Sequence, residues 1–167
     1  APPSVGAAFS AKNPDHDLAL SFGRSGAGVG VGKDLQVDLT ASALRCGEQV
    51  LTLDAATATP GSEPNRVSYR RTGAGAGLDE WYENGPLGLE QGFTFTASPC
   101  ASAESELGIE VAVNGLTPHL GVGQGTDGQR QPMVELLDTA GNARPLYSDW
   151  LAYHAPEIGI AACRERV

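Results

Sequence analysis

The chain has 167 residues, 41% of them hydrophobic, so it is long enough for one folded domain and too apolar for full disorder. No apolar run approaches about 18 residues, which excludes a membrane-spanning helix. The formal net charge is −9 and the main basic pair is Arg70-Arg71, so nucleic acid is excluded as a partner, because phosphate binding needs a basic face.

Short apolar runs with a period of two follow one another along the chain, separated by Gly, Asn, Asp and Pro. Such alternation is typical of half-buried strands, because successive side chains point to opposite faces. In chain order, strands are expected at residues 18–22, 35–40, 50–53, 67–69, 93–96, 107–113, 134–137, 150–153 and 158–162.

Helical patterns are weak, since no window keeps a helical spacing of apolar residues over three turns without Gly or Pro. The dipeptides Asn84-Gly85, Asn114-Gly115 and Asp127-Gly128 are typical of hairpin turns. The sequence therefore predicts an antiparallel β-sandwich, of the jelly-roll or Ig-like kind, with nine to eleven short strands and essentially no helix. No break in composition divides the chain, so we expect a single domain over residues 1–167.

The three cysteines, Cys46, Cys100 and Cys163, lie far apart and form no C-x-x-C motif, which excludes a zinc ribbon. One disulfide and one spare thiol would fit an oxidising compartment, whereas three reduced cysteines would fit the cytosol. The opening Ala1-Pro2-Pro3-Ser4 is typical of a mature end after signal cleavage, which favours the first alternative. We expect a Cys100–Cys163 disulfide, because it would tie a fraying C-terminal end to the sheet and leave Cys46 free or paired with another chain.

Two groups of residues could carry metal binding or catalysis. Asn13, Asp15 and Asp17 have the spacing of the first calcium ligands of an EF-hand loop, but the later positions of that motif are not matched. A looser calcium site there is the alternative to a polar turn, and no other cofactor is expected. Glu80, Glu83 and Glu90 lie near two aromatic residues, and paired carboxylates beside aromatic rings are a feature of glycoside hydrolases.

The stretch from Glu80 to Thr94 reads EWYENGPLGLEQGFT. It resembles a segment near the N-terminus of large secreted bacterial proteins that carry FG-GAP (integrin-like) repeats, and residues 65–71, 9–22 and, more weakly, 146–153 are similar to the same family. The resemblance implies an extracytoplasmic β domain ahead of a repeat array, with a role in surface binding or adhesion and no defined activity. No FG-GAP repeat is present in the 167 residues.

The same stretch also has a direct physical interpretation. Trp81 and Tyr82 would lie on opposite faces of a strand, and a turn would follow them, because Asn and Gly tolerate positive φ and Pro fixes φ. The segment is either a structural corner or a ligand-binding surface, and its candidate residues are Trp81, Tyr82, Asn84, Gly85, Pro86, Glu90 and Gln91.

We therefore expect a non-enzymatic, secreted or cell-surface domain that serves in binding, adhesion or assembly. Its partner would be a protein or glycan at the bacterial surface, or another copy of the chain. The first alternative is a polymerising subunit of an extracellular filament or sheath, favoured by the Gly-rich composition and by open sheet edges. The second alternative is a polysaccharide hydrolase that uses Glu80, Glu83 or Glu90.

Overall fold

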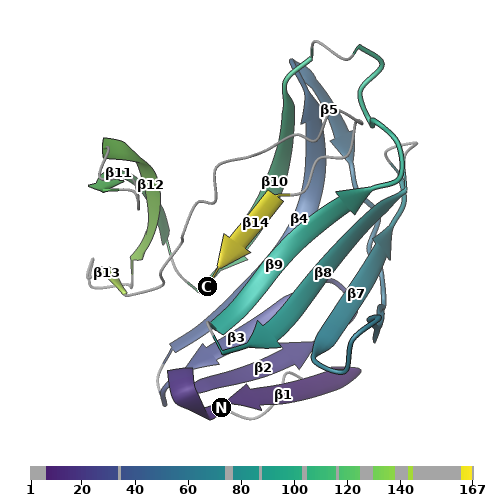
Figure 1. Cartoon of the computed structure of the whole chain (residues 1–167). Coiled ribbons are helices and arrows are strands. Elements are labelled where there is room, and N and C mark those ends of the chain that lie inside the picture. Colours follow the sequence, from purple (N-terminus) through teal and green to yellow (C-terminus); the bar gives the residue numbers. More distant parts are fainter. Residues whose placement is uncertain are drawn as a thin grey trace.

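The structure is a computed structural model, and it describes residues 7–33, 35–73, 77–86, 88–102, 105–115, 117–124, 130–137, 143–144 and 163–166. Two antiparallel sheets face each other, which confirms the predicted all-β sandwich (Figure 1). The described part contains one short 3-10 turn, η1 (Pro14–His16), and no α-helix. The expected strands at 150–153 and 158–162 lie outside the described residues.

The first sheet, here sheet I, contains the N-terminal strands in the order β1-β2-β3-β4-β10, and β5 pairs with the far half of β4. Strands β1 to β5 follow one another along the chain and pair with their neighbours as antiparallel hairpins. Because successive side chains of a strand point to opposite faces, about every second residue of these strands faces the second sheet. The strands are β1 (Phe9–Asn13), β2 (Leu18–Phe22), β3 (Ala27–Val31), β4 (Leu35–Cys46), β5 (Gln49–Thr52) and β10 (Leu107–Asn114).

The second sheet, sheet II, has the order β14-β9-β8-β7-β6. A small third sheet has the order β11-β12-β13 and shares no strand pairing with the other two within the described residues. The strands of these two sheets are β6 (Ala58–Pro60), β7 (Arg66–Arg71), β8 (Leu78–Gly85), β9 (Gly88–Phe95), β11 (Thr117–Gln124), β12 (Arg130–Leu137), β13 (Ala143–Arg144) and β14 (Cys163–Arg166).

The core between sheets I and II consists of two clusters of buried side chains. The larger cluster packs aliphatic residues of sheet I against Tyr69, Tyr82 and Leu89 of sheet II. The smaller cluster packs Ala41 and Leu44 of β4 against residues of sheet II that include Phe95. Burying one large apolar side chain contributes about 1.5–3 kcal/mol, so these clusters supply the main stabilisation of the fold.

A β-bulge in the middle of β4 explains why Ala41 and Leu44, three residues apart, both face the core. The pairing of β10 with β4 shifts register between Glu110 and Val111, opposite Ser42. The Ser42 hydroxyl donates to the Glu110 carbonyl at 3.2 Å and satisfies one backbone group at the irregularity. The extra residue changes which side chains of β4 face inward, as a bulge does.

The disulfide joins Cys46 to Cys100, so the predicted Cys100–Cys163 pairing is wrong. After β9 the chain crosses back to sheet I, where Leu107 pairs with Cys46, and this crossing carries Cys100 to the end of β4. Cys163 instead pairs with Phe93 inside sheet II. Cys46, expected to be free or paired with another chain, is therefore half of the intrachain bridge.

Candidate functional site

The segment from Glu80 to Thr94 forms most of β8 and β9 and the turn between them. Gly85 pairs with Gly88 at the end of the hairpin, and Gly88 has a φ of 111°, which a residue with a side chain rarely adopts. The structure divides the seven candidate residues of this segment among three places: the end of the hairpin, the interior of the sandwich and the outer face of sheet II.

The end of the hairpin connects the two sheets through Asn84. The Asn13 side-chain amide donates to Asn84 Oδ1 and to the Gly85 carbonyl, both at 2.8 Å. Asn84 Nδ2 donates to the Lys12 carbonyl at 3.1 Å, and Asn65 Nδ2 donates to the Asn84 carbonyl at 3.0 Å. We call this set of contacts the asparagine clamp. It fixes the end of β1 in sheet I against the end of β8 in sheet II.

Inside the sandwich, Glu80 is the centre of a buried polar network with Arg71, Tyr82 and Gln91. One carboxylate oxygen, Oε2, accepts from Arg71 Nε at 2.8 Å and lies 2.6 Å from Arg71 Nη2. The other, Oε1, accepts from the Tyr82 hydroxyl at 2.6 Å and from Gln91 Nε2 at 3.0 Å. The side chains of Arg71 and Glu80 are 1% and 0% exposed, so this ion pair is shielded from water.

The remaining donors of the Arg71 guanidinium reach two loops of the sandwich. Nη2 donates to the Ser25 carbonyl at 2.8 Å, and Nη1 lies 3.4 Å from the Asp54 carbonyl. A buried charge is tolerated when it is both paired and hydrogen-bonded. The network therefore holds the loops before β3 and β6 against sheet II, and it has the character of a structural element.

Burial raises the pKa values of both tyrosines in this region. The pKa of Tyr82 is raised well above its usual value, first by burial and then by the negative charge of Glu80. The pKa of Tyr69 is also raised, by burial first and by Glu80 second, and its hydroxyl donates to the Gly26 carbonyl at 2.7 Å. In the folded protein both phenols therefore remain protonated above pH 10, where an ordinary tyrosine ionises.

Trp81 lies on the outer face of sheet II, opposite to Tyr82. The position of a Cβ on Gly92 would be 2.1 Å from Trp81 Cζ2, so the indole lies flat on the Gly92 backbone. The Arg66 guanidinium covers the ring at 3.8 Å from its centroid, and the indole N–H donates to Thr94 Oγ1 at 3.2 Å. With 6% exposure, Trp81 offers almost no surface for a ligand to stack on.

The three candidate carboxylates are not brought together. Glu83 and Glu90 are directly paired across β8 and β9 on the outer face of sheet II, and Glu83 lies 3.9 Å from Arg66. Glu80 points to the opposite face and is held by Arg71. A pair of carboxylates for acid–base chemistry would therefore have to be Glu83 and Glu90, since Glu80 is enclosed.

The candidate calcium segment forms η1 and its flanking residues. Asn13 donates its side-chain amide into the asparagine clamp, and Asp17 closes the turn with a left-handed φ of 52°. His16 Nε2 lies 2.8 Å from the Pro86 carbonyl. In the part of the chain that the structure describes, no three His, Cys, Asp or Glu residues cluster closely enough to hold a metal ion.

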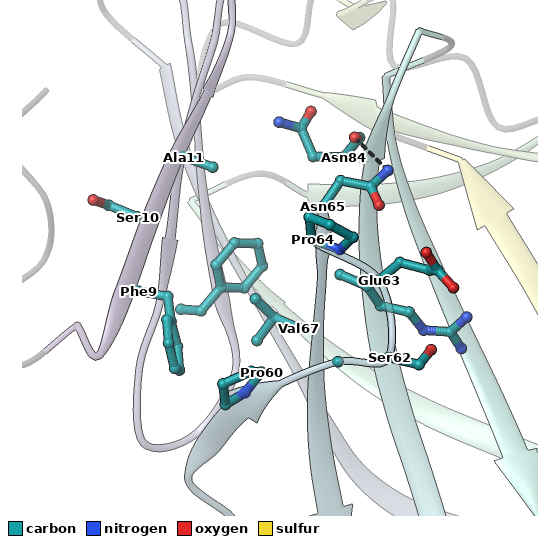
Figure 2. A pocket seen from close by; sticks show the side chains of 13 residues that line it. Phe9, Ser10, Ala11, Pro60, Ser62, Glu63, Pro64, Asn65, Val67 and Asn84 are labelled. Atoms are coloured by element: carbon teal, nitrogen blue, oxygen red, sulfur yellow. Dashed lines mark hydrogen bonds between the residues drawn. The ribbon is translucent and has the colours of Figure 1, made fainter.

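A cavity of about 550 Å³ lies between β1 of sheet I and the segment from Pro60 to Val67 of sheet II. Figure 2 shows the residues that line it: Phe9, Ala11, Val67 and Pro60 supply apolar surface, while Ser62, Glu63 and Asn65 supply polar groups. Asn84 lies at one end of the cavity, where the clamp is. We call this cavity the edge pocket.

No sequence pattern indicates the edge pocket, because its walls come from segments about fifty residues apart that lie close together only when the two sheets pack face to face. The Pro and Gly residues at 59–65 are typical of a loop, but no local pattern places that loop opposite β1. Within the described lining, Asn84 is the residue that also belongs to the predicted candidates.

Searches with this chain matched no protein-family model, no curated protein and no solved structure. The resemblance of the segment from Glu80 to Thr94 to FG-GAP repeat proteins therefore stays a prediction. No helix in the described part is long and apolar enough to cross a membrane.

Proposed function

We propose that the chain is a non-enzymatic binding or assembly domain that works outside the bacterial cytoplasm. The observation that carries the proposal is the edge pocket, which combines an apolar floor with a few polar groups in a volume of about 550 Å³. Most small ligand sites have this character and occupy about 300–1,000 Å³.

The arrangement of the carboxylates favours binding over hydrolysis. Glu80 is neutralised by Arg71 in the interior, and neither Glu83 nor Glu90 lines the edge pocket. The carboxylate that does line it, Glu63, would need a second acid–base group opposite it across the cavity. The described lining contains no second Asp or Glu.

The disulfide supports a location outside the cytoplasm. Cys46 and Cys100 are bonded, and disulfides form and persist mainly in oxidising compartments. The resemblance to secreted repeat proteins is consistent with the same location.

The test is retention of the oxidised chain on bacterial surface material. Purified protein is incubated with washed cell envelopes and with arrays of surface glycans and peptides, and an unrelated acidic protein of similar size serves as control. We expect saturable retention and no released sugar. Sugar release by the wild type that is lost in Glu83→Gln or Glu90→Gln would overturn the proposal in favour of a hydrolase. Growth of filaments from the purified chain would favour the structural alternative.

A further inference from the structure

The edge pocket opens directly on the hydrophobic core of the sandwich. Phe22 belongs to the larger core cluster, and Phe9, Ala11 and Val67 pack against that cluster while also lining the pocket. An apolar group that enters the pocket would therefore extend the core and would be removed from water on several sides, which stabilises the bound state.

One wall of the pocket is the open edge of a sheet. β1 is the last strand of sheet I on this side, and among the described residues no strand pairs with its outer edge. Phe9, Ser10 and Ala11 all line the pocket, although successive side chains of a strand alternate between faces. The backbone of β1 itself therefore borders the pocket, with N–H and C=O groups that another extended chain could pair with.

The opposite wall does not offer such an edge. Among the described strands, β6 is the last of sheet II, and it ends at Pro60, which has no N–H to donate and blocks the addition of a further strand. On β1 the open stretch is short, because Asn84 already donates to the Lys12 carbonyl. The stretch free to accept a partner backbone is thus Phe9 to Ala11.

The charge at the rim of the pocket is negative. Glu63 is exposed, and it takes part in none of the ion pairs between described residues. Arg66 also lines the pocket, but its guanidinium is stacked over Trp81 and lies 3.9 Å from Glu83. The chain as a whole carries a net charge of −9, which adds attraction for a basic partner.

We propose that β1 and the edge pocket bind a short extended peptide segment of another protein, which pairs with Phe9–Ala11 and carries alternating apolar side chains and a basic flank. Every second side chain of the added strand would enter the pocket, as in other cases of strand addition to a sheet edge. This proposal rests on the proposed function and names its ligand class.

The first experiment measures binding of a fluorescein-labelled peptide, KSVTVSVTSK, to the oxidised chain by fluorescence anisotropy. The control peptide has the same composition with its three Val residues adjacent, so it cannot place alternate side chains in the pocket. Two further peptides carry backbone N-methyl groups, one at the Val positions and the other at the Thr and Ser positions between them. Only one set of amides faces β1 in a paired strand, so one methylated peptide should lose binding and the other should keep it.

The second experiment uses variants of the chain. Ala11→Leu fills the pocket, and Ala112→Leu adds the same bulk at an exposed position on β10, the opposite edge strand of sheet I. We expect Ala11→Leu to weaken peptide binding at least about tenfold and Ala112→Leu to leave it unchanged, since the loss of even one or two net contacts changes affinity several-fold. Glu63→Gln should weaken binding about threefold and reduce its salt dependence. Circular dichroism and thermal melting check that each variant is folded.

Absence of binding up to millimolar peptide would overturn the inference, while retention on envelopes would leave the broader binding proposal standing. Equal binding of both methylated peptides would also overturn it, because pairing with β1 would then be excluded. Concentration-dependent self-association that Ala11→Leu abolishes would identify a second copy as the occupant and would likewise overturn the assignment to another protein.

Discussion

At the scale of single residues, Glu80 connects three buried polar side chains in the interior. Its two carboxylate oxygens accept hydrogen bonds from Arg71, Tyr82 and Gln91. Arg71 in turn donates to backbone carbonyls of two loops. Buried ion pairs of this kind add little net stability compared with apolar packing, but removal of one partner leaves an uncompensated charge. The network therefore specifies which loops lie against sheet II more than it strengthens the fold.

Replacement of Glu80 by Gln should destabilise the protein by about 3–5 kcal/mol, because Arg71 would remain buried without a counter-charge. Urea unfolding followed by circular dichroism measures the effect. The matched control is Asp79→Asn, one residue earlier on the same strand, which breaks the exposed Arg70–Asp79 pair at 2.8 Å. That change should cost no more than about 1 kcal/mol. Equal stability of the two variants would contradict a structural role for the buried pair.

The raised pKa values of Tyr69 and Tyr82 predict a loss of stability in alkali. Below about pH 10, the ordinary pKa of tyrosine, both residues are protonated in the folded and unfolded states and stability is unaffected. Above it the unfolded state loses protons that the folded state retains, so the free energy of unfolding falls by about 1.4 kcal/mol per pH unit for each tyrosine.

This behaviour can be followed by phenolate absorbance. Tyr69 and Tyr82 should ionise only together with unfolding, and Tyr82→Phe should reduce the steepness of the transition. Reversible ionisation of all four tyrosines near pH 10 in folded protein would contradict the prediction.

At the scale of elements, the hairpin of β8 and β9 depends on the close contact between Trp81 and Gly92. A side chain at position 92 has no room, because its Cβ would lie 2.1 Å from Trp81 Cζ2. Gly85, at the end of the same hairpin, has no atom within 4 Å of the position of a Cβ. The two glycines thus have different roles in one hairpin.

Gly92→Ala should destabilise the domain by about 1–3 kcal/mol, since the added methyl group displaces Trp81 or shifts β9. The displaced indole should show red-shifted fluorescence, measured in a Trp150→Phe background so that Trp81 is observed alone. Gly85→Ala is the control and should leave the emission of Trp81 unchanged. An unshifted spectrum in Gly92→Ala would show that the ring is not held on Gly92.

Many of the strands can be predicted from the sequence, because the alternation of apolar and polar side chains is a property of each short segment alone. The alternation at 18–22, 35–40 and 107–113 depends only on which side chains face the core, and those stretches are strands. The polar network cannot be predicted in the same way. Alternation places Glu80 and Tyr82 on one face of a strand, but it does not show that this face is buried or that Arg71 of another strand lies beside Glu80. The disulfide was missed for a similar reason, since it depends on the pairing of Leu107 with Cys46.

For the molecule as a whole, the Cys46–Cys100 bridge connects the end of sheet I to the segment that leaves sheet II. It joins residues 54 positions apart in the sequence, which on the chain-entropy model stabilises the folded state by about 4 kcal/mol. The chain between the two cysteines includes all of β5 to β9. In the unfolded state the bridge therefore restrains the segment that forms most of sheet II when the protein folds.

Cys46→Ser and Cys100→Ser should each lower stability by about 2–4 kcal/mol, whereas Cys163→Ser should leave the bridge and its contribution in place. Thermal melting with and without reductant provides the measurement, because reductant should lower the melting temperature of the wild type and of Cys163→Ser but not of the other two variants. Peptide mapping without reduction should recover the Cys46–Cys100 pair and a single alkylated thiol at Cys163. Recovery of a Cys163-containing bridge would contradict the pairing.

The asparagine clamp and the disulfide hold the sandwich at opposite ends, and this arrangement has a mechanical consequence. The clamp joins β1 to β8 where the hairpin turns, and the bridge is at the other end of β4 (Figure 1). A force that slides one sheet along the other would load the hydrogen bonds of Asn13 and the covalent bridge at the same time, and the bridge would still hold after those hydrogen bonds break. Once the bridge is reduced, the sheets could hinge apart about the clamp alone, so the resistance of this domain to pulling should depend on its redox state.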